Sequence, residues 1–190
     1  MNSSKRSTPL TLSTPRLELI AATLELVRAE VSNLATFAAL LDVPTPSSWP
    51  PPLNDENSQR YTLNSLEQAS PADAGWSVWY CIRRKPRTLL GIVAYKGSPI
   101  DGCAEIGYSI LDEFQRQGFC TEAARALIRW GFQNLAVDRI VAATLPGLVP
   151  SIRIMEKCGM QFAGKGMEDG METIRYELTR EQFIERYDGV

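Results

Sequence analysis

The chain has 190 residues, of which 44% are hydrophobic and 22% charged, and it carries a formal net charge of −2. This composition predicts one soluble globular domain over residues 1–190 with a sizeable core, and its slightly acidic balance does not favour a nucleic-acid surface. The sequence contains no histidine, which excludes a histidine-based metal site, catalytic triad or general base.

The four cysteines also argue against a metal or redox centre. Cys81, Cys103, Cys120 and Cys158 stand too far apart for a C-x-x-C pair, so free thiols in a reducing compartment are the simplest interpretation. No apolar run approaches the length of a membrane span, and the amino-terminal residues lack the core of a signal peptide. We therefore expect a cytoplasmic protein with no metal and no membrane contact, in which residues 1–14 are a mobile lead-in.

The amino-terminal half predicts a strand, a helix, a long loop and a second helix. Apolar residues fall at helical spacing over residues 23–41, with Thr23 as the cap. Five prolines over residues 43–58 exclude a helix or an interior strand, so this segment is expected to be a functional or disordered loop. A strand over residues 15–22 precedes the first helix, and the second helix follows the loop over residues 59–68.

The carboxy-terminal half predicts a mixed sheet. A strand, a helix and a second strand in succession give a right-handed crossover between parallel strands, whereas the hairpins are antiparallel. The fold class is therefore α/β, as a mixed α+β sheet with helices on its faces. The elements are strands over residues 76–84, 89–97, 103–111 and 139–145, a long helix with an apolar face from Ala124 to Leu135, a helix over residues 150–157 capped by Gly159, a hairpin from residues 160–164 and 171–178, and a final helix with a Thr179–Gln182 capping box.

A polar turn with one glycine, Gln115-Arg116-Gln117-Gly118, leads directly into the long helix. A helix start exposes unpaired N–H groups and the positive end of the helix dipole, and a glycine turn can add further N–H groups around a phosphate. The turn is therefore either a phosphate cradle or a plain connection between a strand and a helix.

Two further stretches flank this turn. Glu105-Ile106-Gly107-Tyr108 lies on the preceding strand, and Ser-Ile-Arg-Ile-Met-Glu-Lys-Cys-Gly, residues 151–159, lies on the next helix. Together with the turn, they resemble the GCN5-related N-acetyltransferase (GNAT) superfamily, and within it the RimJ/RimL-type N-terminal acetyltransferases, over residues 15–178. The resemblance implies a central, mostly antiparallel sheet with two splayed parallel strands, helices on both faces, and acetyl-CoA as the acetyl donor.

The resemblance also implies the cofactor contacts. Backbone N–H groups at the helix start would bind the pyrophosphate of acetyl-CoA, and Arg116 would add a charge-assisted contact. Backbone groups of Ile110 and Leu111 would bind the pantetheine arm, and one N–H there would polarise the thioester carbonyl. The implied cofactor-binding residues are Ile110, Leu111, Gln115, Arg116, Gln117, Gly118, Phe119, Cys120 and Thr121.

Three positions depart from the family pattern. Cys120 replaces the glycine or alanine that ends the loop motif, and we interpret it as a packing residue rather than a nucleophile because no base pairs with it in the sequence. Leu148 replaces the usual asparagine of the second motif. Met155 stands where some members carry a tyrosine that protonates the departing thiolate, so the general acid is not assigned.

Acetyl transfer needs a neutral amine, so a base must take the proton of the amine, directly or through water. Glu105 is the first candidate, because it lies on the strand beside the expected thioester; the alternative is an ordinary salt bridge. Ser151 is a candidate to contact the cofactor sulfur or to help protonate the thiolate; the alternative is a helix cap or a surface serine. The expected route is direct attack in a ternary complex.

The amine acceptor is expected on the side covered by the two amino-terminal helices, where Trp49, the aromatic residues over 76–80 and the final hairpin would shape its pocket. Taken by itself, a single tryptophan in the middle of the proline-rich loop indicates that Trp49 anchors the loop rather than recognises a ligand. The acceptor would be a small primary amine or a protein N-terminal α-amine, and the protein would be a monomer or a homodimer. A non-catalytic acyl-CoA-binding sensor is the main alternative. The acidic pI argues against a helix-turn-helix regulator, and the lack of a G-x-x-x-x-G-K motif argues against a nucleotide-binding fold.

Overall fold

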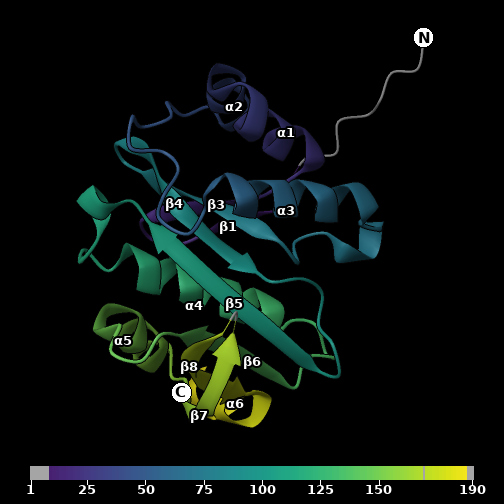
Figure 1. Cartoon of the computed structure of the whole chain (residues 1–190), viewed down its shortest axis with the longest axis vertical. Coiled ribbons are helices and arrows are strands. Elements are labelled where there is room, and N and C mark those ends of the chain that lie inside the picture. The colour runs from purple at the N-terminus through teal and green to yellow at the C-terminus, as the bar shows by residue number, and fades with distance from the viewer. Residues whose placement is uncertain (1–8, 169, 188–190) are drawn as a thin grey trace.

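The computed structural model describes residues 9–168 and 170–187, which build one eight-stranded sheet with helices against it (Figure 1). The strand order is β1-β2-β3-β4-β5-β6-β8-β7, and every neighbouring pair is antiparallel except β5 with β6. The strands are β1 Thr11–Ser13, β2 Leu17–Ala21, β3 Val78–Arg84, β4 Arg87–Tyr95, β5 Cys103–Ile110, β6 Arg139–Thr144, β7 Gln161–Glu168 and β8 Met171–Thr179.

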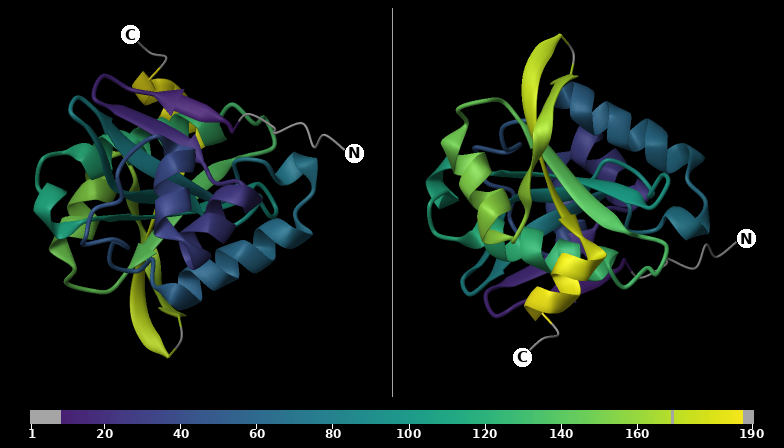
Figure 2. Two further views of the ribbon diagram at one scale, coloured as in Figure 1. Left: turned by 90° about the horizontal axis from the view of Figure 1, so that it is seen from above. Right: turned by 90° about the horizontal axis from the view of Figure 1, so that it is seen from below.

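Helices cover both faces of this sheet. Figure 2 shows α3 on one side of the sheet and α4 and α6 on the other, with the β7–β8 hairpin projecting on the α3 side. Within the described residues, no helix is long and apolar enough to cross a membrane. The helices are α1 Leu24–Ser32, α2 Leu34–Leu41, α3 Glu56–Gln68, α4 Phe119–Gly131, α5 Val149–Lys157 and α6 Arg180–Tyr187.

Two apolar cores follow from the alternation of side chains along the strands. On one face, Ile106 of β5 packs in a cluster with Leu127 of α4. On the other face, Phe37 of α2 and Tyr80 of β3 belong to a second cluster beneath α1 and α2. Trp79, the immediate neighbour of Tyr80, lies in the first cluster, so adjacent aromatic residues of one strand serve opposite faces.

The parallel pair predicted from the crossover is confirmed, and it is short. Within the described residues, β5 pairs with β6 only from Cys103 to Glu105, opposite Arg139 to Val141. The rest of β5 continues beside β4, with pairs from Ile106 to Ile110. The two parallel strands therefore splay apart beyond Glu105, as the family resemblance implied, and the gap that opens between β5 and β6 is called the splay below.

The helix predicted over residues 23–41 is wrong in one respect, because it is two helices. Asn33 separates them: it has an extended backbone, with φ of −159°, and its side-chain oxygen accepts hydrogen bonds from the N–H groups of Ala35 and Thr36. An asparagine side chain can offer the backbone this alternative to a continuous helix.

Two other boundaries differ from the prediction. The apolar face of the long helix does not extend to Leu135, because α4 ends at Gly131 and the chain turns there through a bond from Asn134 N–H to Gly131 O (3.1 Å), leaving Leu135 86% exposed. The lead-in predicted over residues 1–14 includes β1, which pairs with β2. Residues 1–8 of that lead-in lie outside the described residues.

Candidate active site

The turn between β5 and α4 has the backbone shape of an anion cradle. Arg116 and Gly118 adopt left-handed conformations, with φ of 58° and 80°, and Gly118 is the N-cap of α4. The first hydrogen bond of the helix runs from Glu122 N–H to Gly118 O (3.1 Å), so the N–H groups of residues 119–121 have no acceptor within the helix. In the described part of the chain, no other group accepts from them. The turn thus presents unpaired N–H groups at the positive end of a helix dipole.

The two glutamines of the turn fix its shape. Gln115 Nε2 donates to the carbonyl of Ile110 (3.0 Å) and to Asp112 Oδ1 (2.7 Å), and Gln117 Nε2 donates to Glu113 O (3.1 Å). These side chains therefore hold the turn against the end of β5, while the side chain of Arg116 is exposed to solvent.

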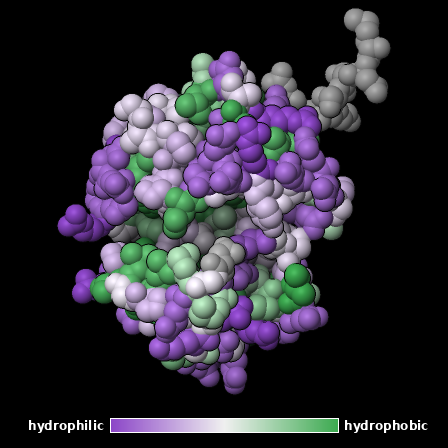
Figure 3. Space-filling view, in the orientation of Figure 1, coloured by the Kyte–Doolittle hydropathy of each residue, from purple (hydrophilic) through white to green (hydrophobic). Residues whose placement is uncertain are grey.

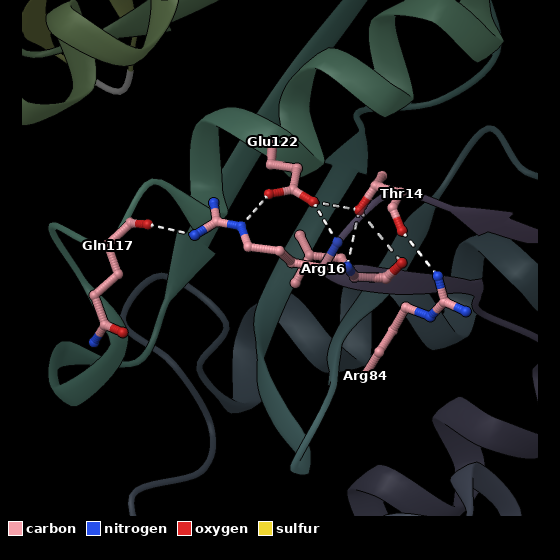
Figure 4. A network of polar contacts seen from close by, with 6 residues as sticks. Thr14, Arg16, Arg84, Gln117 and Glu122 are labelled. Atoms are coloured by element: carbon pink, nitrogen blue, oxygen red, sulfur yellow. Dashed lines mark hydrogen bonds and ion pairs between the residues drawn. The ribbon is translucent and has the colours of Figure 1, made fainter.

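A polar network, absent from the sequence-based prediction, braces the other side of the turn (Figure 4). The Arg16 Nε lies 2.6 Å from Glu122 Oε2, and Arg16 Nη1 donates to Gln117 O at 2.9 Å. The hydroxyl of Thr14 (2.5 Å) and the backbone N–H of Arg16 (2.9 Å) also donate to Glu122. Partial burial alone would raise the pKa of Glu122, but these hydrogen bonds from Thr14 and Arg16 lower it overall.

The backbone of β5 turns every second residue toward the splay. Lys96 N–H donates to Glu105 O and Leu111 N–H donates to Leu90 O, both at 2.9 Å, so the odd-numbered residues bond to β4. The N–H and C=O groups of the even-numbered residues, including Ile110, consequently point toward β6. The carbonyl of Ile110 accepts from Gln115 Nε2, which leaves the N–H of Ile110 facing β6, and the N–H of Leu111 is already bound to Leu90 O.

Glu105 stands at the last paired position of β5, where the splay begins. Its neighbours Ala104 and Ile106 pack in the α4-side core, so its own side chain points to the α1–α3 side. There it forms an ion pair with Lys96, whose ammonium also lies 3.5 Å from a Glu168 carboxylate oxygen. Burial lowers the pKa of Lys96, but hydrogen bonding and ion pairing with Glu105 and Glu168 raise it overall, so Lys96 is charged at neutral pH.

A second carboxylate shares this face of the sheet. Glu105 pairs with Val141 of β6, and Val141 pairs with Glu177 of β8, so the three side chains form one row across the strands. No motif marks Glu177, and only the strand register brings it into this row. Figure 3 shows a hollow across the middle of this face, over β5, with apolar side chains around it.

Ser151 lies on the other side of β5, beside Tyr108. The Tyr108 hydroxyl is 3.0 Å from the carbonyl oxygen of Ser151 and 3.1 Å from its Oγ. Burial raises the pKa of Tyr108 well above its usual value, so this hydroxyl stays protonated at neutral pH. Met155 is fully buried in the same core and carries no proton donor. The hydroxyls of Tyr108 and Ser151 are therefore the proton donors on this side of β5 that could replace the tyrosine of other family members.

The cysteines behave as packing residues. Among the described residues all four are free thiols. Burial raises the pKa of the Cys120 thiol far above neutral pH, and it raises that of Cys158 to about 11. A thiol with such a pKa is a poor nucleophile, which supports the packing interpretation of Cys120. In the described residues, no group of three His, Cys, Asp or Glu side chains is arranged to hold a metal ion.

The predicted aromatic pocket is wrong, because these rings are core residues. Trp49 is 7% exposed and donates through Nε1 to Glu30 (3.2 Å), which confirms that it anchors the proline-rich loop and does not line a pocket. Tyr80 is fully buried beside it, and Trp76 and Trp79 lie in the core on the α4 side. Sequence alone did not reveal which face each ring would serve.

The proline-rich loop reaches the carboxy-terminal end of β5. The Ser109 hydroxyl donates to the carbonyl of Pro52, and the Ser48 hydroxyl lies 2.5 Å from Glu113 Oε1. The hydrogen bond from Ser48 lowers the pKa of Glu113. The loop thus lies against the carboxy-terminal end of β5 on the α1–α3 side, next to the turn that leads into α4.

Comparison with known proteins identifies the family. The acetyltransferase (GNAT) domain model matches residues 16–161, and the chain belongs to this family. It is 38% identical to the uncharacterized N-acetyltransferase YnaD of Bacillus subtilis over 83 residues, which are 44% of this chain and 49% of YnaD. A second Bacillus subtilis relative is covered to 56%, so the chain spans about half the length of the curated relatives it matches.

Solved structures share the fold across most of the chain. An acetyltransferase (GNAT family) from Bacillus anthracis superposes with a TM-score of 0.61 at 20% identity, covering 90% of this chain and 99% of that one. The ribosomal L7/L12 α-N-protein acetyltransferase RimL, in complex with coenzyme A, gives a TM-score of 0.62 at 17% identity over 90% and 98% of the two chains. At these identities the likeness shows the fold alone.

Proposed function

We propose that this protein is an acetyl-CoA-dependent N-acetyltransferase that transfers the acetyl group to a primary amine. The observation that carries the proposal is the turn at Gly118, where unpaired N–H groups at a helix start lie at the end of the splay. The turn is suited to bind the pyrophosphate of acetyl-CoA, and the backbone of Ile110 is suited to bind the pantetheine arm. The five residue steps from Ile110 back to Glu105 span about 17 Å of strand, and we assign the thioester end of acetyl-CoA to the region of Glu105.

Glu105 is then placed to receive the proton of the attacking amine, directly or through a water molecule. Lys96 keeps a positive charge beside this carboxylate, and Glu177 in the same row adds negative charge that favours an approaching ammonium. On the other side of β5, Ser151 is placed to give a proton to the departing thiolate, with the Tyr108 hydroxyl as its partner. The amine attacks the thioester directly in a ternary complex, so positioning supplies much of the rate.

The acceptor is a small primary amine or a protein N-terminal α-amine. The hollow over β5 is open to solvent and lies between α3 and the β7–β8 hairpin (Figures 2 and 3). The structural likeness to RimL, an α-N-protein acetyltransferase, supports including α-amines among the candidates. We expect the protein to act in the cytoplasm as a monomer or a homodimer.

Calorimetric titration with coenzyme A and thiol-release assays over a panel of amines and peptides test this proposal. Gly118→Val is expected to abolish cofactor binding for two reasons. A side chain would strain the left-handed backbone, and its Cβ alone would lie 3.3 Å from Arg16 Nη2. Gly97→Val is the matched control, since Gly97 also has a positive φ, of 122°, but has no atom near its Cβ in the described structure. Unchanged binding by a folded Gly118→Val variant would show that the turn is not the cofactor site, and binding without turnover would favour a sensor.

A further inference from the structure

We propose that Arg16 is a positioning residue for cofactor binding, which holds the phosphate-binding turn in shape and cancels the charge of Glu122; this inference rests on the proposed function. Arg16 lies between β1 and β2, outside every motif of the site. Its guanidinium contacts Glu122 and the carbonyl of Gln117, and its Cζ lies 4.5 Å from the centre of the Phe119 ring. One side chain thus touches the turn, the first residue of α4 and the first acidic residue of that helix.

The charge of Glu122 makes such a residue necessary. Glu122 lies in the first turn of α4, and its side chain is 17% exposed. A carboxylate there interacts with the same positive helix end that would attract a diphosphate, and it repels an anion bound nearby. Glu122 accepts three hydrogen bonds, from Thr14 Oγ1, from the backbone N–H of Arg16 and from Arg16 Nε. The carboxylate is therefore held against the β1–β2 turn and neutralised by a guanidinium.

The orientation of one peptide group gives a second role to Arg16. In a trans peptide, the C=O and the N–H point in opposite directions. Because Arg16 Nη1 binds the carbonyl of Gln117 at 2.9 Å, the N–H of Gly118 in the same peptide group points away from Arg16. Arg16 Nη2 lies 3.3 Å from the position that a Cβ of Gly118 would occupy, so the guanidinium packs directly behind the glycine. Arg16 thereby fixes the direction in which the turn presents an N–H donor.

The test compares acetyl-CoA with acetyl-pantetheine, which has the thioester but no phosphates. Arg16→Gln is expected to raise the Kd for coenzyme A and the KM for acetyl-CoA roughly tenfold, while turnover of acetyl-pantetheine stays within about twofold. Adding Glu122→Gln to Arg16→Gln should recover part of the lost affinity, because the uncompensated charge is then gone. A residue that only supported the fold would give neither the selectivity nor this recovery.

Arg84→Gln is the matched control, because Arg84 donates to the carbonyl of Thr14 (3.2 Å) in the same network but contacts neither Gln117 nor Glu122 within the described structure (Figure 4). Its Kd for coenzyme A should equal that of the wild type. Unchanged coenzyme A affinity in Arg16→Gln, or an equal loss with acetyl-pantetheine, overturns the inference. Failure of the wild type to bind coenzyme A would instead overturn the proposed function, so the two failures are distinguishable.

Discussion

Replacing Glu30 with alanine is expected to destabilise the fold strongly, because its buried carboxylate collects four donors. Glu30 is 6% exposed and accepts hydrogen bonds from Trp49, Asn54, Gln59 and Tyr80 at distances between 2.6 and 3.3 Å. A buried donor left without a partner costs about 1–3 kcal/mol. Because such losses are not additive in one network, the free energy of unfolding should fall by less than the sum of four such terms, by about 3–5 kcal/mol.

Urea and thermal unfolding followed by tryptophan fluorescence measure this change, and the midpoint temperature should fall by roughly 10 °C. Glu67→Ala is the control: Glu67 forms an exposed ion pair with Arg28, and its loss should change stability by no more than about 0.5 kcal/mol. A Glu30→Ala variant as stable as the control would refute the claim that this carboxylate anchors the proline-rich loop.

The same residue predicts a pH dependence. Burial raises the pKa of Glu30 above its ordinary value of 4.5, even though the hydrogen bonds from Tyr80, Asn54 and Trp49 lower it. The folded protein therefore binds this proton more tightly than the unfolded chain, and the contribution of Glu30 to stability falls as the pH rises from about 4.5 through the folded-state pKa. Glu30→Gln should remove this slope from the pH profile of unfolding.

Three further predictions test the site and one helix end. Glu105→Gln should lower kcat about 100-fold in a thiol-release assay without changing the Kd for coenzyme A. An unaltered kcat would show that Glu105 is not the general base and that its role is the ion pair with Lys96. Cys120→Ala should retain turnover, and complete loss of turnover in a folded variant would point to a covalent role. In the wild type, the Cys120 thiol should react slowly with iodoacetamide at neutral pH because burial raises its pKa. Thr179→Ala should cost about 1 kcal/mol in urea unfolding, because Thr179 Oγ1 and Gln182 Oε1 cap each other's N–H groups at 3.2 and 3.0 Å; no change would mean that this cap does not stabilise α6.

Elements with a strong local pattern could be predicted from sequence. The three strands within residues 76–111 are rich in β-branched and aromatic residues, and clear turn sequences separate them. Because the connections are short, neighbouring strands were expected to pair as antiparallel hairpins. The turn at Gly118 and the left-handed Gly159, with φ of 89°, were predicted because few other residues adopt that backbone readily. The break at Asn33 was missed, since apolar residues continue at helical spacing on both sides of it.

Contacts between distant segments could not be predicted from the sequence. Arg16 and Glu122 are 106 residues apart, and no local pattern marks either one as the partner of the other. The row that contains Glu177 depends on the register of β8 against β6, which becomes fixed only when the sheet is assembled. Trp79 and Tyr80 show the same limit, because alternation separates their faces but does not say which helices cover each one.

The alternating backbone bonds of β5 affect how such a protein can diverge. Under the proposed function, the groups that Ile106, Tyr108 and Ile110 turn toward the splay belong to the main chain, so exchanging a side chain leaves them in place. Proline is the one residue that would delete such an N–H. Exchanges of β5 side chains that preserve the fold would therefore leave these main-chain contacts to the ligand unchanged, even where they alter the core or the chemistry beside it.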